Sequence, residues 1–346
     1  SNTNIRIIPI LDKHKKLKAV AYYNEIHFKI GKKILNNQSN YTYLIAEIGV
    51  NHNGRIEEAI ELIDNISDAG FDAVKMQFRS SETYSKTKMD NDIDLSTEYI
   101  LSELRRVELT YDQEKEIVNY IKKKKLDFIG TPFDNKSLQR LLIYKPDAIK
   151  IASCDITNNI LIENCSKNNL PLILSTGMSN ETEILRTNQL LEDMNVNRCF
   201  LHCNSTYPTP IDDVNLSYIN RLKLITNCII GYSSHDGNKL IPLASIASGA
   251  KIVELHITKD KNAIGTDHIA SISLGETKEF VESARKLSIA NGSDSPRVPT
   301  QGELMNKIPL GKSLCYAKDF EAGYQIGSTD DFIACSPGDG IPVPDY

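Results

Sequence analysis

The chain has 346 residues, of which 40% are hydrophobic and 25% are charged, and its formal net charge is −5. This acidic balance, without a stripe rich in lysine and arginine, argues against a nucleic-acid partner. No apolar run approaches the roughly 20 residues of a membrane-spanning helix, and no signal-peptide layout opens the chain, so we expect a cytoplasmic protein with no membrane partner.

The first 40 residues are expected to form an extension that precedes the main domain. Within it, residues 5–24 read IRIIPILDKHKKLKAVAYYN. Two β-type runs on either side of the polar DKHKK segment are typical of two strands joined by a turn.

Eight short apolar runs follow, and amphipathic segments separate them. Strands are predicted at 43–49, 72–78, 126–131, 147–153, 170–176, 199–204, 228–234 and 251–257. Helices are predicted at 55–70, 111–124, 180–194, 215–225 and 239–249. Regular alternation of strand and helix indicates parallel pairing. Eight such units, with no glycine-rich dinucleotide fingerprint after the first strand, favour one (β/α)8 TIM barrel, of class α/β, over residues 41–290.

The end of the chain has a different composition. Residues 291–307 are rich in Gly, Pro and Ser and are predicted to be a linker. Residues 308–346 contain short β-type runs and many turn residues, which indicate a small β-rich domain. So short a segment cannot build a large core, and we therefore expect this domain to be incomplete.

The seven cysteines form an odd set with no CxxC pair. This pattern favours reduced thiols over a disulfide framework or a zinc site. We therefore expect all seven to be packing residues, at positions 154, 165, 199, 203, 228, 315 and 335.

The last predicted strand, in the segment IVELHITKD (252–260), carries charge where a buried strand is usually apolar. A period of two puts Val253, Leu255 and Ile257 on one face, and Glu254, His256 and Thr258 on the other. Polar residues late in a barrel strand point into the mouth of the barrel, where active sites lie. Collected from the ends of the eight runs, such residues are Glu47, Lys75, Gln77, Thr131, Lys150, Ser153, Asp155, Ser175, His202, Tyr207, Ser233, His235, Glu254 and His256.

Two groups in this set indicate chemistry. His235 and His256 end consecutive strands and are placed to share a divalent cation, although each alone is also compatible with a hydrogen-bonded core histidine. Lys75 and Lys150 on the inner side of strands indicate a phosphate or carboxylate ligand. The alternative for the lysines is a salt bridge to Glu47 or Asp155.

Several motifs together resemble the sialic acid (N-acetylneuraminate) synthase family, which includes legionaminic and pseudaminic acid synthases. The resemblance covers about residues 42–290, and the segment from 308 is similar to the start of the antifreeze-like (SAF) domain of those enzymes. The N-terminal stretch resembles the tail of a CBS-type regulatory domain. The motifs are AEIGVNHNG (46–54), KMQ (75–77), GTPFD (130–134), KIASCDITN (150–158), STGMS (175–179), LHCNSTYPTP (201–210), GYSSHD (231–236), ELHIT (254–258) and GTDHIAS (265–271).

The resemblance implies condensation of phosphoenolpyruvate with an open-chain aldose such as N-acetylmannosamine, giving a nonulosonic acid such as N-acetylneuraminate and phosphate. It implies a divalent metal, commonly Mn2+ with Mg2+ or Co2+ as alternatives, held by His235 and His256. The implied catalytic residues are Glu47, Asp155, His235 and His256. A homodimer is implied, in which the C-terminal domain reaches the neighbouring subunit. The implied substrate-binding residues are Lys75, Gln77, Thr131, Lys150, Ser153, Ser175, Ser205, Tyr207, Ser233 and Asp267.

The chain departs from the family pattern at three places. Cys154 and Asp155 stand where the family often has Gly-Glu, and Ser205 stands for an asparagine. Ser336 occupies the position of an arginine that the family offers to the sugar of a neighbouring subunit, and a serine does not replace a guanidinium fork. The acyl pattern of the sugar therefore stays open, with legionaminic, pseudaminic or non-acylated products as alternatives.

Three other functions remain open from the sequence. A Schiff-base aldolase would use Lys75 or Lys150 to condense with pyruvate itself. A non-catalytic sugar-binding or regulatory barrel would bind ligand without releasing phosphate. A synthase for a shorter, eight-carbon keto sugar would share the fold and the phosphoenolpyruvate donor.

Overall fold

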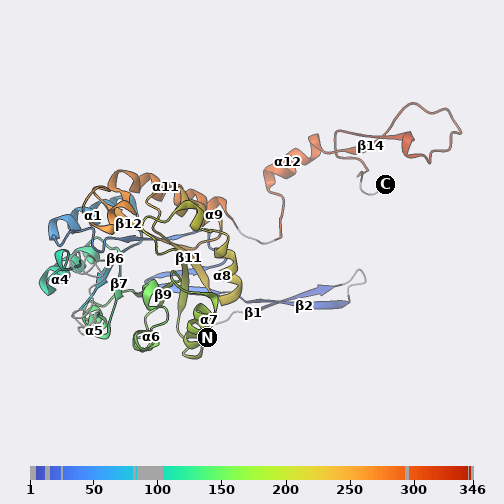
Figure 1. The fold of residues 1–346 in the computed structure, drawn as a ribbon. Coiled ribbons are helices and arrows are strands. Elements are labelled where there is room, and N and C mark those ends of the chain that lie inside the picture. The colour runs from blue at the N-terminus through green and yellow to red at the C-terminus, as the bar shows by residue number, and fades with distance from the viewer. Residues whose placement is uncertain are drawn as a thin grey trace. The chain divides into compact units, whose positions relative to one another are not determined.

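The eight predicted strands form one closed parallel sheet in a computed structural model of the chain (Figure 1). Strands pair in chain order, and the last strand pairs with the first through Ile252↔Tyr43 to His256↔Glu47, which closes the barrel. The prediction of a (β/α)8 barrel is confirmed. The strands are β5 (Tyr43–Glu47), β6 (Ala73–Phe78), β7 (Asp127–Pro132), β8 (Ala148–Ile151), β9 (Leu172–Ser175), β10 (Arg198–Cys203), β11 (Ile229–Ser234) and β12 (Ile252–Thr258), with β13 (Ile272–Ser273) added beside β12.

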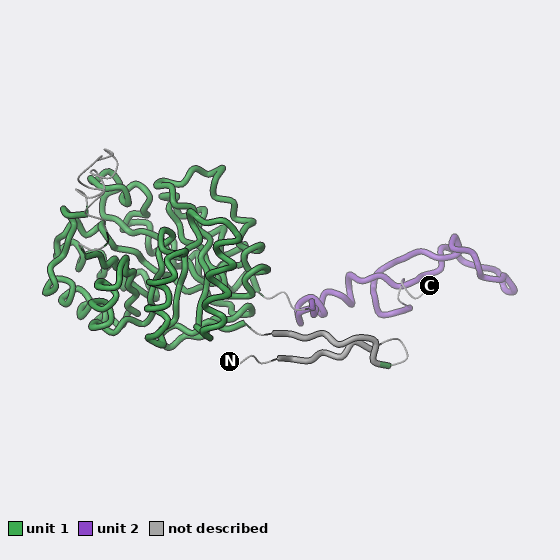
Figure 2. Tube along the Cα trace, turned by 60° about the horizontal axis from the view of Figure 1, so that its bottom comes forward, with its two compact units in different colours: residues 1–293 green, residues 294–346 purple. Residues whose placement is uncertain are grey.

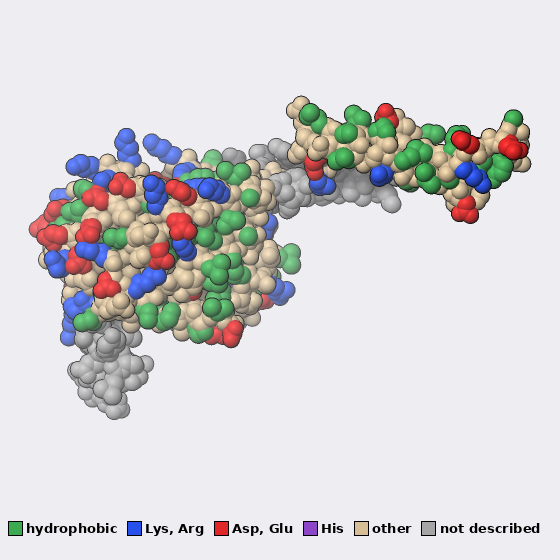
Figure 3. All heavy atoms as spheres, turned by 90° about the horizontal axis from the view of Figure 1, so that it is seen from above, with side chains coloured by type: hydrophobic (Ala, Val, Ile, Leu, Met, Phe, Trp, Pro, Cys, Tyr) green, Lys and Arg blue, Asp and Glu red, His purple; other side chains and the backbone are tan. Residues whose placement is uncertain are grey.

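The structure describes residues 5–11, 16–24, 26–80, 83, 104–292, 296–341 and 343, and for the strands within 5–24 it describes the backbone alone. Among these residues, no helix has the length and apolarity needed to cross a membrane. In the space-filling view of Figure 3, basic and acidic side chains are interspersed over the barrel unit.

Helices surround the barrel strands (Figure 1). All five predicted helices are present, and local sequence explains their ends. Gly70 ends the first helix in the left-handed region at φ 89°, and Thr110 and Asn180 begin two others with capping boxes. The helices α5, α6 and α11 were not predicted individually. The helices are α1 (Ile56–Ala69), α4 (Tyr111–Lys123), α5 (Asn135–Ile143), α6 (Asn159–Ser166), α7 (Glu181–Asp193), α8 (Tyr218–Thr226), α9 (Leu240–Ala247), α11 (Thr277–Ala290), the short α10 (Thr266–Ile269), and the 3-10 turns η1 (Ser153–Asp155), η2 (Ile211–Asp213) and η3 (Leu274–Glu276).

The strands have two faces with different partners. Val253, Leu255 and Ile257 of β12 pack outward in the core that the helices share with the strands. Ile252 of the same strand belongs to a second apolar cluster inside the barrel. The predicted alternation along β12 is confirmed, and it leaves Glu254 and His256 on the inner face, above an apolar floor.

A hairpin of β3 (His27–Ile30) and β4 (Lys33–Asn36) supplies part of that floor. Its residues Phe28, Ile30 and Leu35 pack with the first inner residues of the barrel strands, such as Tyr43 and Ile252. The hairpin therefore covers the end of the barrel where the strands begin. These residues belong to the predicted N-terminal extension, for which no role in the barrel was expected.

Two antiparallel strands, β1 (Ile5–Leu11) and β2 (Leu17–Asn24), precede the hairpin. They match the predicted strand–turn–strand segment. The turn predicted between them lies mostly outside the described residues.

The chain divides into two compact units, residues 1–293 and 294–346 (Figure 2). The second unit contains α12 (Gln301–Leu310), β14 (Ser313–Tyr316), η4 (Thr329–Asp331) and β15 (Phe332–Cys335). The small β unit expected at the C-terminus is present. A capping box of Thr300 and Glu303 begins a helix inside the segment predicted to be a linker. Of the described residues in this unit, only Ser313 and Asp331 are buried, so no apolar core holds it together.

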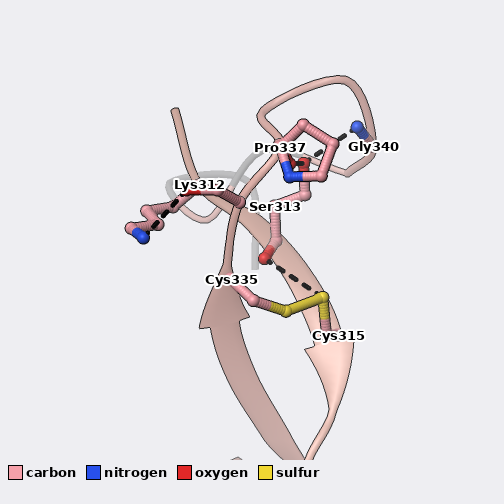
Figure 4. The surroundings of a disulfide bond; sticks show 7 residues. Lys312, Ser313, Cys315, Cys335, Pro337 and Gly340 are labelled. Carbon is pink, nitrogen blue, oxygen red and sulfur yellow. Dashed lines mark hydrogen bonds between the residues drawn. A yellow bond between two sulfur atoms is a disulfide. The ribbon is translucent and has the colours of Figure 1, made fainter. Parts of the chain in front are cut away.

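A disulfide bond between Cys315 and Cys335 joins the two strands of the C-terminal hairpin (Figure 4). The antiparallel register pairs Ser313 with Cys335 and so brings the two thiols to adjacent positions on neighbouring strands. Beside the bond, the Ser313 hydroxyl donates to the Pro337 carbonyl and accepts from the Gly340 N–H, both at 2.8 Å. The prediction that all seven cysteines are reduced is therefore wrong for this pair, because the pairing depends on strand register and not on a sequence motif. The other five are free.

Candidate active site

The resemblance implied four catalytic and ten substrate-binding residues. Twelve of these fourteen line one cavity of about 400 Å³ at the ends of the barrel strands. Several of them, such as Lys150 of β8, Ser175 of β9 and Ser233 of β11, are the last inward-facing residues of their strands, and this is why distant sequence positions meet. The structure thus brings together Lys75, Gln77, Thr131, Lys150, Ser153, Ser175, Ser205, Tyr207, Ser233, His235, His256 and Asp267.

Lys75 of β6 lies among acidic groups at the base of the cavity. Its Nζ contacts Glu47 Oε2 of β5 and lies 3.5 Å from Glu254 Oε1 of β12. It also donates to Thr131 Oγ1 at 3.3 Å. Burial by itself would lower the pKa of Lys75, but Glu254 and Glu47 outweigh it and raise that pKa. Lys75 therefore remains an ammonium ion.

Lys150 of β8 approaches the carboxylate of Glu254 from across the barrel. Its Nζ donates to Ser175 Oγ at 2.6 Å and lies 3.5 Å from Glu254 Oε1. The hydroxyl of Ser233 donates to that oxygen at 3.0 Å. Burial lowers the pKa of Lys150. The pKa of Glu254 falls to about 2, because Lys150 and Lys75 outweigh the effect of burial. One carboxylate thus lies beside both buried lysine side chains, and its Oε2 has no hydrogen-bond partner.

His235 lies just after β11 with its ring fixed on both sides. Its Nδ1 lies 2.7 Å from the Asn204 carbonyl oxygen, and only an N–H can make that bond. Its Nε2 lies 2.8 Å from the Tyr207 hydroxyl, whose ring stacks on the imidazole. Burial would lower the pKa of His235, but Cys203 outweighs it and raises that pKa. When the ring is neutral, the lone pair on Nε2 accepts from Tyr207.

His256 of β12 is the second imidazole of the cavity, 5.4 Å from His235 between ring centroids. Burial and the nearby His235 lower the pKa of His256 to about 3, so the ring is neutral. Its Nδ1 is buried without a hydrogen-bond partner and lies 3.4 Å from Asp267 Oδ2. An unpartnered nitrogen in a polar cavity is costly unless a ligand completes it.

These two rings fit a divalent cation on chemical grounds. Metal-binding histidines are neutral, and they usually donate the other ring N–H to a carbonyl or a carboxylate, as His235 does to Asn204. Among the described residues no cluster of three His, Cys, Asp or Glu side chains is arranged to hold a metal alone. Two imidazoles therefore leave the remaining positions to water or substrate.

Glu47 and Asp155 do not line the cavity. Glu47 is fully buried behind Lys75, and its Oε1 accepts the Gly49 N–H. Asp155 lies in the turn η1 and accepts from Asn158 Nδ2 at 2.9 Å. The sequence left open a salt bridge from either lysine to Glu47 or Asp155, and the outcome differs between the two lysines. Lys75 does pair with Glu47, whereas Lys150 pairs with Glu254 and not with Asp155.

The turn STGMS passes close over the hydroxyl groups of the cavity. A Cβ added to Gly177 would lie 2.2 Å from Ser205 Oγ and 2.7 Å from Ser153 Oγ. Glycine at this position therefore lets the backbone approach both hydroxyls. His202, one of the strand-end residues collected from the sequence, points away. Its Nε2 lies 2.7 Å from the Val214 carbonyl oxygen behind β10.

The cavity also contains residues without a predicted role. Glu254 was recognised as a strand-end residue but was given no part in the site. Arg79 directly follows β6 and donates to Gln77 Oε1 at 2.9 Å, so the rule that found Lys75 and Gln77 could have included it. Arg106 and His268 also line the cavity. Arg106 lies in a short helical stretch before α4 and His268 in the short helix α10, where no strand pattern indicates which side chains face the cavity.

A (β/α)8 barrel with a polar cavity at the carboxyl ends of its strands is the architecture of an enzyme. Residues 62–295 match the model of the NeuB family. The chain belongs to this family.

Relatives named for their activities support the assignment. The chain is 35% identical to N,N'-diacetyllegionaminic acid synthase of Campylobacter jejuni, over 88% of this chain and 93% of the relative. It is 31% identical to N-acetylneuraminate-9-phosphate synthase of Mus musculus, over 88% and 86%. The crystal structure of an N-acetylneuraminic acid synthetase from Leptospira borgpetersenii superposes with a TM-score of 0.74 at 30% identity, covering 82% of this chain and 95% of that one.

Proposed function

We propose that this protein condenses phosphoenolpyruvate with an open-chain amino aldose and releases a nonulosonic acid and phosphate. The observation that carries the proposal is the convergence of Lys75 and Lys150 on Glu254 in the cavity that also holds His235 and His256. Buried cations beside hydroxyl donors suit a small dianion, and paired imidazoles suit a divalent metal. Membership of a family with sialic and legionaminic acid synthases supports the same reaction.

The reaction joins C3 of phosphoenolpyruvate to the aldehyde carbon of the sugar. The aldehyde oxygen takes a proton, water adds to C2, and the bond between C2 and the phosphate oxygen breaks to leave a 2-keto acid. Lys75 and Lys150 would balance the phosphate and carboxylate charges during these steps. Gln77, Tyr207 and Asp267 would face the sugar, and Glu47 could accept a proton through its contact with Lys75.

A metal ion, preferentially Mn2+ with Mg2+ or Co2+ as alternatives, would be held by His235 and His256. Such an ion would polarise the aldehyde oxygen. The Tyr207 hydroxyl rests on His235 Nε2 at 2.8 Å, so the tyrosine would shift to free that nitrogen for a metal. Asp155 would act by ordering the start of α6 through Asn158, whose side chain caps that helix.

The assembly and compartment belong to the same proposal. We infer a cytoplasmic homodimer in which the C-terminal unit, as the start of an antifreeze-like domain, reaches the neighbouring subunit. Ser336 would then approach the sugar in place of an arginine. This favours an aldose whose recognition does not depend on a guanidinium fork.

One observation favours a second candidate function. Burial lowers the pKa of Lys150, and a neutral amine is the form that condenses with pyruvate in a Schiff-base aldolase. Treatment with borohydride and pyruvate, followed by peptide mass analysis, tests this reaction. Reduction of an adduct on Lys150 would establish the aldolase, and no adduct is expected from the synthase.

Phosphate release from phosphoenolpyruvate tests the synthase directly. The protein is incubated with Mn2+ and each of N-acetylmannosamine, its 6-phosphate, a diacetamido-trideoxyhexose, mannose and arabinose 5-phosphate. We expect phosphate and 2-keto acid in equal amounts with one of the amino sugars. Release with arabinose 5-phosphate alone would identify an eight-carbon synthase. Binding of phosphoenolpyruvate without release in any mixture would identify a non-catalytic barrel.

A further inference from the structure

Asn51, in the loop between β5 and α1, links two parts of the candidate site that are far apart in sequence. Its Nδ2 donates to the Ile257 carbonyl oxygen and to Ser271 Oγ, both at 2.9 Å. Ile257 directly follows His256 in β12. The Ser271 hydroxyl in turn donates to the Asp267 carbonyl oxygen at 2.6 Å. One amide thus connects the strand of His256 to the helix of Asp267.

The amide is buried in this position. Asn51 is 1% exposed and Ser271 is fully buried, so water does not replace the two bonds. The Oδ1 of Asn51 is buried without a hydrogen-bond partner, as is the Nδ1 of His256. A buried acceptor that lacks a donor costs free energy, and such groups are retained where they serve a site.

The backbone around Asn51 is held in an unfavourable conformation. Val50 has φ 60° and Asn53 has φ 52°, in the left-handed region that a β-branched residue such as valine rarely adopts. Val50 lines the cavity, whereas Asn51 does not. Strain of this kind persists where surrounding contacts fix a loop for function.

We propose that Asn51 is a positioning residue that sets the placement of Asp267 against His256. Asn51 touches neither ring nor carboxylate, so it acts through the Ile257 carbonyl and through Ser271. The 3.4 Å between His256 Nδ1 and Asp267 Oδ2 is the distance that this link maintains. The inference rests on the proposed synthase function, in which Asp267 faces the aldose and His256 the metal.

The link is confined to the aldose side of the cavity. Lys150 and Ser233, which would hold phosphoenolpyruvate, bond to Ser175 and Glu254 and not to Asn51 or Ser271. Loss of the link should therefore affect aldose use while phosphoenolpyruvate binding persists. A purely structural residue would affect both through general loss of folded protein.

The test is N51D, which keeps the shape of the side chain but replaces the donor with an oxygen. The control is N65D, because Asn65 makes a similar pair of bonds away from the cavity, donating to the Leu274 carbonyl at 3.2 Å and accepting from Thr277 Oγ1 at 2.7 Å. Each variant is measured for kcat/KM with the aldose, for the Kd of phosphoenolpyruvate by calorimetry, and for thermal stability.

We expect N51D to lower kcat/KM for the aldose by about 10- to 100-fold, the usual effect of losing a group that orients site residues. The Kd of phosphoenolpyruvate should stay within about twofold of the wild type, because the link does not include the residues that would bind phosphoenolpyruvate. N65D should leave both values near those of the wild type. Equal losses in aldose turnover and phosphoenolpyruvate binding, or equal effects of N51D and N65D, would overturn the inference.

S271A keeps the test decisive if N51D does not fold. It removes the hydroxyl between Asn51 and Asp267 without adding a buried charge, and it should lower aldose kcat/KM in the same selective way. A wild-type level of turnover in S271A would sink the inference. A wild-type protein that releases no phosphate with any aldose would instead overturn the proposed function and the inference with it.

Discussion

Lys150 and Glu254 face each other across the barrel, from β8 and β12, with 3.5 Å between Nζ and Oε1. The two strands are four positions apart around the closed sheet, so these side chains meet only because the barrel is closed. Glu254 also pairs with Lys75, so a small anion that enters the cavity would meet two lysine side chains close together. This arrangement makes the lysines the most direct test of phosphoenolpyruvate binding.

Lys150→Met should weaken phosphoenolpyruvate binding by about 10- to 100-fold, because a hydrogen bond to a charged group contributes about 1.5–3 kcal/mol. Isothermal calorimetry measures the change. Lys167→Met is the control, since the Lys167 ammonium bonds to Asn164 at the exposed surface. Unchanged affinity in Lys150→Met would remove Lys150 from the binding site.

Chelation should abolish phosphate release, and His256→Ala should lower the affinity for Mn2+. The physical reason is that His256 presents a neutral, unpartnered imidazole nitrogen inside the cavity. Electron paramagnetic resonance of free Mn2+ during a titration reports the affinity without relying on turnover. His202→Gln is the control, because His202 bonds to the Val214 carbonyl on the outer side of β10. Equal Mn2+ affinity in wild type and His256→Ala would count against this ligand.

The barrel was predictable because its strands repeat one simple pattern. Each strand is short and is covered by helices, and most strands end in polar inner residues, as β12 does with Glu254 and His256 after Ile252. The sequence therefore predicted that Lys75 and Lys150 would lie in one cavity. It did not predict that Lys75 and Lys150 would both pair with Glu254, because the choice of partner depends on which strands face each other across the closed sheet.

The features that the sequence did not predict lie outside this repeat. Asp155 sits in a turn after β8, where no periodicity tells which way a side chain points, and it bonds to Asn158 instead of lining the cavity. The β3–β4 hairpin covers the barrel through three apolar side chains that are too few to give a pattern. The Cys315–Cys335 bond depends on strand register, which a cysteine count does not contain.

Thiol counting should find five free cysteines in the denatured, unreduced protein and seven after reduction, because only Cys315 and Cys335 are bonded. Mass analysis after alkylation gives the count and the positions. The bond closes a segment with a sequence separation of 20, and such a closure stabilises a unit by about 3 kcal/mol in the chain-entropy model. Cys315→Ser should therefore increase proteolysis within residues 296–341 while the barrel stays resistant. Alkylation of all seven cysteines without reductant would show that the bond does not form.

Phe28→Ala should lower the free energy of unfolding of the barrel by about 3–5 kcal/mol, the usual cost of removing a buried aromatic side chain. Phe28 is fully buried among the first inner residues of the strands, so its loss leaves a cavity that the closed sheet cannot easily collapse to fill. Ile34→Ala in the same hairpin is the matched control, because Ile34 is 61% exposed and should change the free energy of unfolding by less than about 0.5 kcal/mol. Urea unfolding followed by far-ultraviolet circular dichroism measures both. Equal losses in the two variants would mean that the hairpin contributes only its backbone pairing, and that the floor of the barrel is stable without Phe28.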